Sequence, residues 1–387
     1  MASYILSNEN RVYTAAEAVF GEVAPVTAQG AVPLVRLQVQ ERDREPKRRD
    51  KTGSRSFGGY GTGLRRVTAF QLDTYHTGVE VPGQEPACGA LVGSAFGGPV
   101  KVYNGGTLAS APSGSTIEFS GAHGLSVGQG VVSGSEIRFV AAVPDSTRVV
   151  LNAPFAGGGG VATGGTWSCS PGAWLPSASV FDYWSPVSAV QRILRGATVD
   201  RFEAEINGDY HEFRFRGFAA ELLDSISFVP GQGGLSSFPQ EPTGRRTPLL
   251  VPGHLGQVWL GISPARAYTI TGAKVVVENA IDPRDREYGS NIPRAFVPGE
   301  RRVTLQLSMY ETDEGAVQDL FRASRERSPI SVMLQLGEQP GQLCGLYLPR
   351  VVPEVPEFVD SDIRLEWSFS ASRAQGEADD EIFIAFG

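Results

Sequence analysis

A six-residue motif occurs twice in this chain, and this repeat constrains the fold more than any other feature. Residues 63–68 read GLRRVT and residues 299–304 read GERRVT. After each copy, apolar or aromatic residues alternate with polar ones, the pattern of a strand with one buried face. Before each copy lie a charged stretch and a further alternating segment. The shared order predicts two related β domains, each with a strand, a charged loop and a second strand.

Composition and charge favour β structure and exclude some functions. The chain of 387 residues contains 47 glycines and 26 prolines, which favours many turns over long helices. Its length fits two or three domains. A net charge of −8 argues against a protein that grips nucleic acid over its whole surface, because phosphate binding needs excess Lys and Arg. A locally basic patch remains compatible with this balance.

The cysteines and the first residues bear on the compartment. Cys88, Cys169 and Cys344 lie far apart, so they predict neither a disulfide framework nor a CxxC metal site, and a reducing compartment fits. The start of the sequence lacks the basic and long apolar regions of a signal peptide, and no apolar run approaches membrane-spanning length. We therefore expect a protein made inside a cell, without a membrane partner.

The first part of the chain predicts a β domain with an insertion. Thr14–Phe20 predicts a short helix, alternation predicts a strand at 32–40, and an apolar run predicts a helix at 87–96. Residues 105–165 are rich in Gly, Ser, Val and Ala, with expected strands at 116–119, 136–140 and 148–151. Ser185-Pro186 is typical of a helix start, and Gly196 of its end. The expected division is an N-terminal arm at 1–27, a first domain at 28–104 and 166–228, and a small inserted β domain at 105–165.

Asn207-Gly208 predicts a hairpin with a two-residue type I′ turn, since this turn needs positive φ at both positions. In that register Ile206 faces Asp209, and Phe202 faces Phe213. The pattern then predicts an apolar face and a charged face. The apolar face contains Phe202, Ala204, Ile206, Phe213 and Phe215, and the charged face contains Arg201, Glu203, Glu205, Glu212, Arg214 and Arg216.

The second part predicts a linker at 229–260 and a second domain at 261–387. A strand pattern begins near Tyr268, and a charged loop at 282–287 precedes the second motif copy. The strongest helix signal follows Thr312, a capping residue, with Asp313 and Glu314 near the positive helix end. Its apolar stripe contains Val317, Leu320 and Phe321. Strands are expected at 331–336, 343–348 and 362–370.

Signals for catalysis or metal binding are weak. His76, His123, His211 and His254 are scattered without zinc-ligand spacing. Asp282, Asp285 and Glu287 lack the glycine and distal glutamate of an EF-hand loop. No Gly-Lys-Ser/Thr follows the glycine-rich segments, and no nucleophile elbow occurs. The sequence therefore predicts a non-enzyme with no catalytic site, metal or cofactor.

The order of strand, long charged loop, GxRRVT strand, helix and closing strands resembles the major tail tube proteins of long-tailed bacteriophages. The segments at 372–376 and 379–382, the Asn207-Gly208 hairpin and the His123-Gly124-Leu125 insertion add to this similarity. The resemblance implies a mainly β fold with two antiparallel sandwich or barrel domains, each with a flanking helix, plus a small β insertion domain.

The same resemblance implies rings that stack into a DNA-conducting tube. Two tube domains in one chain imply a homotrimeric ring with pseudo-sixfold symmetry, with a hexamer as the alternative. We expect assembly in the host cytoplasm, a place in the virion tail and contacts with other tail proteins. DNA is expected to pass through the lumen without specific binding.

Two groups of charged residues are candidates for this role. A lumen that conducts DNA should repel phosphate, which gives the lumen-facing candidates Glu203, Glu205, Glu212 and Glu366. Arg201, Arg214, Arg216 and Arg364 share these faces, so a solvated outer face is the alternative. The basic loop at 42–66 and the acidic C-terminal part between Glu354 and Glu381 are complementary in charge, so salt-sensitive contacts between subunits or rings are expected. The candidates there are Arg48, Arg49, Arg65, Arg66, Arg301, Arg302, Asp379 and Asp380.

Two other functions remain open from the sequence. A β-rich surface or glycan-binding module would use the insertion, with Trp167, Trp174 and Trp184 as stacking residues. A depolymerase or lyase would need a catalytic pair that the sequence does not suggest. For the motif arginines, we expect charge reversal at Arg65 and Arg302 to impair ring assembly before it unfolds the monomer. If these arginines form an internal ion pair instead, charge reversal should destabilise the monomer first.

Overall fold

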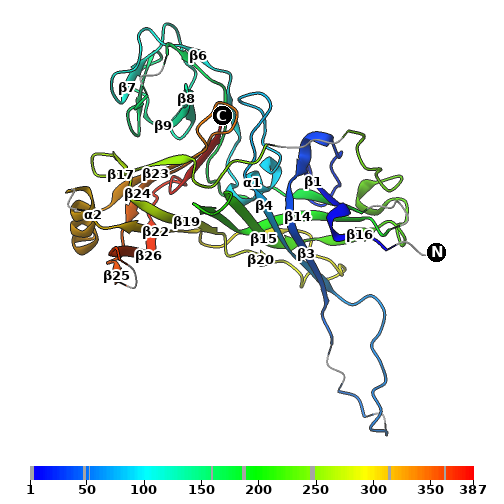
Figure 1. Ribbon diagram of the computed structural model, residues 1–387. Helices are drawn as coiled ribbons and strands as arrows, with labels where there is room; N and C mark the ends of the chain where they lie inside the picture. Colours follow the sequence, from blue (N-terminus) through cyan, green and yellow to red (C-terminus); the bar gives the residue numbers. More distant parts are fainter. Residues whose placement is uncertain are drawn as a thin grey trace.

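The computed structural model describes residues 4–46, 49–51, 53–157, 160–184, 189–244, 249–312, 315–360 and 363–387. The fold is mainly β with large antiparallel sheets, which confirms the predicted fold class. Figure 1 shows a body of stacked sheets, with the inserted segment at one end and a long hairpin loop projecting from the opposite side. None of the described helices is long and apolar enough to cross a membrane.

One sheet, which we name the long sheet, runs through the whole body. Its neighbouring strands are all antiparallel. In spatial order they are β3 (Leu34–Asp43), β4 (Arg66–Tyr75), β15 (Glu212–Ala219), the C-terminal part of β14 (Arg192–Ile206), β19 (Ile270–Glu278), β22 (Arg302–Tyr310), β26 (Glu366–Ala374) and β25 (Glu357–Val359). Within the described residues, β3 pairs only with β4 and β25 only with β26, so these strands form the two edges.

Two further sheets cover the apolar face of the long sheet. The first contains β2 (Ala31–Val32), β1 (Asn10–Ala16), β13 (Ala178–Trp184), the N-terminal part of β14, and β16 (Glu221–Asp224). The second contains β18 (Ala265–Ala267), β17 (Gly256–Gly261), β23 (Ile330–Leu336), β24 (Cys344–Val352), β27 (Phe383–Phe386), β12 (Thr166–Cys169) and β5 (Lys101–Tyr103). Helix α1 (Gly89–Phe96) is buried beside the first sheet, and α2 (Gly315–Glu326) lies beside the second.

The strand pairings of residues 10–224 recur in residues 256–386. In the first set β1 pairs with β2 and β13, β14 pairs with β13, β15 and β16, and β4 pairs with β3 and β15. In the second set β17 pairs with β18 and β23, β24 pairs with β23, β26 and β27, and β22 pairs with β19 and β26. The long bent strand β14 corresponds to β24 and β25 together, which Pro353 and Pro356 separate because proline cannot donate to a ladder. The β14–β19 pair joins the two halves.

The inserted segment forms its own small sheet and packs on the second half. Strands β7 (Thr116–Glu118), β10 (Arg148–Leu151), β9 (Glu136–Ala142) and β8 (Gly130–Ser133) are adjacent, and β6 (Gly106–Thr107) pairs with β11 (Ala162–Thr163). Phe139 stacks on Tyr347 with ring centroids 5.4 Å apart. Arg138 is fully buried, lies 4.6 Å from the ring centroid of Trp259 and pairs with Glu136 at 3.3 Å. Burial lowers the pKa of Arg138 to about 10.

Short elements complete the fold. They are the 3-10 helices Ser7–Glu9, Ala28–Gly30 and Gln232–Gly234, and the pair of β20 (Asp282–Pro283) with β21 (Phe296–Val297). The last pair lies in the charged loop between β19 and β22. Strand β1 lies within the expected N-terminal arm, and β17 begins within the expected linker.

Several local predictions are confirmed. The strands after both motif copies, the helix at 89–96, the helix after residue 312, and the insertion strands form close to the expected bounds. Asp313 and Glu314 lie outside the described residues.

Two helix predictions are wrong. Of the helix expected at Thr14–Phe20, residues 14–16 belong to β1 and the rest is loop and turn. Val12 and Tyr13 of β1 are buried between β2 and β13, so tertiary pairing overrides local propensity. Residues 185–188, the expected start of a further helix, lie outside the described part of the chain. Its expected end is strand, because β14 begins at Arg192 and buries Ile193 and Leu194. The last long strand also starts later than predicted, at Glu366, and Ile363 is exposed.

The hairpin register is wrong by two residues, although the two faces are as predicted. Phe202 pairs with Phe215, and the connection spans residues 207–211 in place of a two-residue turn. Asn207 has a φ of 70° and donates to the carbonyl of Thr271, while Tyr210 bridges to Pro252. These long-range contacts widen the loop. Shifting by two residues keeps every side chain on its face, so the phenylalanines remain buried.

Candidate functional site

The free face of the long sheet carries a network of ion pairs centred on Glu203. This carboxylate is only 2% exposed, and its oxygens lie 2.6 Å from Lys274 Nζ and 2.6 Å from Arg201 Nε. Arg216 and Arg214 lie further away, at 3.8 Å and 4.0 Å. Burial alone would raise the pKa of Glu203, but hydrogen bonds from Lys274 and Arg201 hold this pKa below its ordinary value.

Three of the four lumen-facing candidates lie together around this network. Glu205 and Glu212 face each other across β14 and β15, and both pair with Arg214, at 3.1 Å and 3.0 Å. Glu366 lies apart on β26, where it accepts a hydrogen bond from the hydroxyl of Thr271. The candidate carboxylates near Glu203 are therefore neutralised by neighbouring cations, an arrangement that differs from a plain row of negative charges.

The first motif copy contacts the charged loop of the other half. The backbone amide of Arg66 donates to Asn291 O at 2.8 Å, and its side chain pairs with Glu41 at 3.1 Å. Arg65 donates to the carbonyl of Glu287 at 3.2 Å. Two of the predicted inter-subunit candidates thus have partners inside this chain. Arg49 is exposed, and Arg48 lies outside the described residues.

The second motif copy forms a different set of contacts. Arg301 is nearly buried and pairs with Asp379 at 2.9 Å and Glu381 at 3.3 Å, and it donates to the carbonyl of Gly172. Asp380 pairs with Arg350 at 2.8 Å. Arg301, Asp379 and Asp380 were candidates for contacts between subunits, and in this structure each has an intramolecular ion pair.

The two motif copies are also out of phase by one residue. In β4 the buried positions are Thr68, Phe70 and Leu72, whereas in β22 they are Val303, Leu305 and Leu307. Identical residues of the two copies therefore face opposite sides of the long sheet, with Thr68 buried and Thr304 half-buried. A shift of one residue reverses the face of every side chain in a strand.

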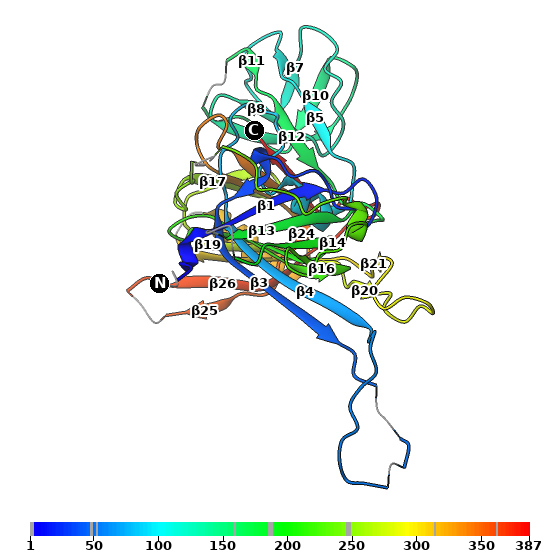
Figure 2. The same cartoon turned by 90° about the vertical axis from the view of Figure 1, so that its right-hand side faces the viewer.

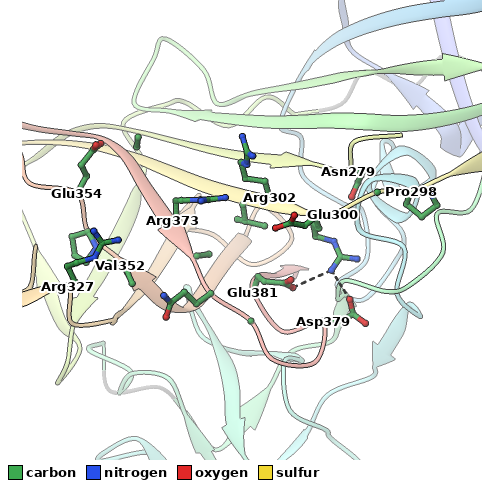
Figure 3. A pocket seen from close by; sticks show the side chains of 18 of the residues that line it. Asn279, Pro298, Glu300, Arg302, Arg327, Val352, Glu354, Arg373, Asp379 and Glu381 are labelled. Atoms are coloured by element: carbon green, nitrogen blue, oxygen red, sulfur yellow. Dashed lines mark hydrogen bonds and ion pairs between the residues drawn. The ribbon is translucent and has the colours of Figure 1, made fainter. Parts of the chain in front are cut away.

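A cleft of about 1180 Å³ lies beside the second motif copy, and we name it the arginine cleft (Figure 3). It is bordered by the start of β22, the end of α2, the break between β24 and β25, and the end of β26 with the loop that follows. Asn279, directly after β19, also lines it. Glu300 and Glu354 also line it. Within the described residues, four exposed arginines of this cleft have no side-chain hydrogen bond or ion pair: Arg302, Arg325, Arg327 and Arg373.

Two of the four histidines are buried and hydrogen-bonded to backbone carbonyls of distant segments. His76 and His211 are buried, and their Nε2 atoms donate to the carbonyls of Gln342 and Leu255, both at 3.0 Å. Burial lowers the pKa of His76 to about 3 and also lowers that of His211. In the described part of the chain, no group of three or more His, Cys, Asp or Glu side chains could hold a metal ion.

The tryptophans do not form one stacking surface. Trp167 is buried against Phe386 with ring centroids 5.8 Å apart, and Trp184 is half-buried at the end of β13. Trp174 is 72% exposed and lies in the loop between β12 and β13.

Comparison with models of known protein families and with curated proteins finds no match to this chain. A function therefore has to follow from the geometry described above.

Proposed function

We propose that this chain is a structural subunit of a tube, in which copies join head to tail into rings and the rings stack. The observation that carries this proposal is the pair of sheet edges. Inside the chain β14 of the first half pairs with β19 of the second, and the corresponding strands β25 and β3 are the edges of the long sheet. An unpaired edge is a template for another strand. Pairing β25 with β3 of the next copy would repeat the internal junction.

Such a contact is heterologous, and heterologous contacts close into a ring when the rotation between copies permits it. Three copies of the long sheet would supply roughly 24 strands, which gives a barrel about 45–50 Å across between backbones at ordinary strand spacing and tilt. This channel is wider than that of a porin with 16–18 strands. A homotrimeric ring with pseudo-sixfold symmetry is therefore the favoured assembly, and a hexamer is the alternative.

The free face of the long sheet would line this channel, because its other face packs against the two covering sheets (Figure 2). The lining around Glu203 would be hydrophilic, with its cations already paired to carboxylates. Cations that are already paired with carboxylates neutralise few phosphates and so release few counterions from DNA, and DNA would pass without being held. The inserted domain, on the far side of a covering sheet, would lie outside the tube.

These properties fit the tail tube of a long-tailed bacteriophage, the family that the sequence resembles. The chain would then be assembled in the host cytoplasm, contact other tail proteins at the tube ends and remain in the virion as a conduit for DNA ejection.

Electron microscopy of the purified full chain tests this proposal, together with light scattering over a range of concentrations. We expect rings with threefold symmetry and an open channel, and stacks of such rings at higher concentration. Monomers at every concentration would contradict the proposal and favour the surface-binding module.

A further inference from the structure

The first half has a counterpart of the arginine cleft, and the chain itself fills it. Asn279, directly after β19, is buried and donates to Ala95 O at 2.9 Å and Val199 O at 3.0 Å. The amide of Ile281 donates to Asp200 Oδ1 at 2.7 Å. These contacts lie at the end of α1 and at the bend of β14. The backbone amide of Arg66, at the start of β4, donates to Asn291 O in the same β19–β22 loop.

The equivalent elements of the second half border the arginine cleft. The end of α2 corresponds to the end of α1, the break between β24 and β25 to the bend of β14, and the start of β22 to the start of β4. An acidic residue lies at each bend, Asp200 in the first half and Glu354 in the second. The first-half site is occupied by the loop after β19, whereas the second-half site is an open cleft.

The strand that corresponds to β19 is β3, so the segment that corresponds to Asn279 and its neighbours is residues 43–45. Asp43 ends β3 and is exposed, and its side chain has no hydrogen bond or ion pair within the described residues. Within its own chain this segment contacts the β19–β22 loop, where Arg44 pairs with Asp285 at 3.8 Å. It does not lie in the arginine cleft of its own chain, because four strands separate β3 from β22, which borders the cleft.

The chemistry of the two sites differs in a complementary way. Asn279 offers amide hydrogens, and its site offers carbonyl acceptors. Asp43 offers carboxylate oxygens, and the arginine cleft offers guanidinium donors from Arg302 and Arg373, on neighbouring strands (Figure 3). In the first-half site the loop segment donates and the surrounding groups accept. In the arginine cleft the segment would accept and the surrounding arginines would donate.

We propose that the arginine cleft binds the base of the β3–β4 loop of a second copy of this chain, with Asp43 against Arg302 and Arg373. This contact rests on the proposed ring. It places the loop of one subunit on the second half of its neighbour, as the β19–β22 loop lies on the first half within one chain. Phe57 and Tyr60, which pack edge to face at 4.9 Å and are both exposed, belong to the same loop and would be covered by the neighbour.

Charge reversal in the full chain tests this contact. The Arg302→Glu/Arg373→Glu variant should assemble only at a concentration at least tenfold higher than the wild type. Asp43→Arg should have a similar effect, and combining it with the two glutamates should restore assembly. The control is Arg322→Glu/Arg148→Glu, because these arginines are exposed outside both the cleft and the β3–β4 loop and should leave assembly unchanged. Circular dichroism melting of each monomer verifies folding.

Cross-linking gives a second, independent measurement. Asp43→Cys/Arg302→Cys should form covalent oligomers on oxidation of assembled protein, while the three native cysteines are buried. A wild-type chain that never assembles overturns the ring and this contact together. A wild type that assembles, with cleft variants that behave like the control and no covalent oligomers, overturns the contact and leaves the ring proposal standing.

Discussion

The two charged loops occupy corresponding places in their halves but have different surroundings. The β19–β22 loop lies against the first half, where Phe296 is 7% exposed and packs on Phe20 and Phe218 at 5.5 Å and 6.2 Å. The β3–β4 loop projects from the body, and its Phe57 and Tyr60 are 70% and 42% exposed (Figures 1 and 2). Sequence within a loop does not determine its burial here. The burial of each loop depends on whether another part of the chain packs against it.

The aromatic residues of the two loops should differ most in their effect on stability. Phe296 and Tyr60 each lie three residues before the glycine of a motif copy. Phe296→Ala removes a buried ring and should lower the unfolding free energy by about 3–4 kcal/mol. Tyr60→Ala should lower it by less than about 1 kcal/mol, because the ring is partly exposed and its contacts, Phe57 and Glu45, lie within the same projecting loop. Urea denaturation of both monomeric variants measures the difference.

Equal losses in the two variants would mean that the β3–β4 loop is also fixed to its own chain. A small loss for Phe296→Ala would mean that the β19–β22 loop contributes little to the first half. Either result would remove the contrast between an internal and an external loop.

The residues at the ends of β19 and β3 give the next largest contrast. Asn279→Ala leaves two buried carbonyls, those of Ala95 and Val199, without their donor and should cost about 2 kcal/mol. Asp43→Ala should leave the monomer within about 0.5 kcal/mol of the wild type and weaken assembly. Thermal melting and light scattering separate these effects. An Asp43→Ala variant that melts early yet assembles normally would reverse the assignment of the two ends.

Strand positions were predictable because alternation is a local signal. Both motif strands, and the two-faced hairpin with Phe202 and Phe215, follow from the two-residue period. Register was not predictable in the same way. The hairpin loop is widened by Thr271 and Pro252, which come from distant parts of the chain, and the motif copies differ in phase because strand pairing sets the buried face.

The candidate site shows the same limit. Alternation placed Glu203 on a charged face, but its burial depends on Lys274, which β19 brings next to β14. The arginine cleft could not be predicted, because its borders come from separate elements that are distant in the sequence. The sequence does contain one related signal, the correspondence of Asn279 and Asp43, which precede two loops of similar length.

Arg301 and Arg65 occupy the same position in the two motif copies, and their replacement should lower the unfolding free energy by amounts that differ less. Arg301→Ala removes two ion pairs and a hydrogen bond from a nearly buried position, and we expect a loss of about 1–2 kcal/mol. Arg65→Ala loses one hydrogen bond to the carbonyl of Glu287 and should cost about 0.5 kcal/mol. Denaturant titration at low and high salt measures both. A larger loss for Arg65→Ala would show that the first copy is the more important for stability.

A pH-dependent effect is expected at the junction between the halves. His76, after β4, donates to Gln342 of the second half, and burial lowers the pKa of His76 to about 3. The unfolded imidazole has a pKa of about 6.5. Below that pH the unfolded chain binds a proton that the folded chain does not, so stability is full above about pH 6.5 and falls toward pH 3. Between pH 6.5 and 5.5 the loss from this group should be at most about 1.4 kcal/mol.

His76→Gln should reduce this slope without abolishing it, because the pKa of buried His211 is lowered as well. The exposed His254 provides the comparison: its charge adds to the lowering of the His211 pKa, and His254→Gln should change the slope less than His76→Gln does. Unfolding free energies of the three proteins at several pH values measure the difference. If His76→Gln keeps the full slope while His254→Gln reduces it, the acid-sensitive group lies at the surface, and the junction between the halves does not depend on a neutral His76.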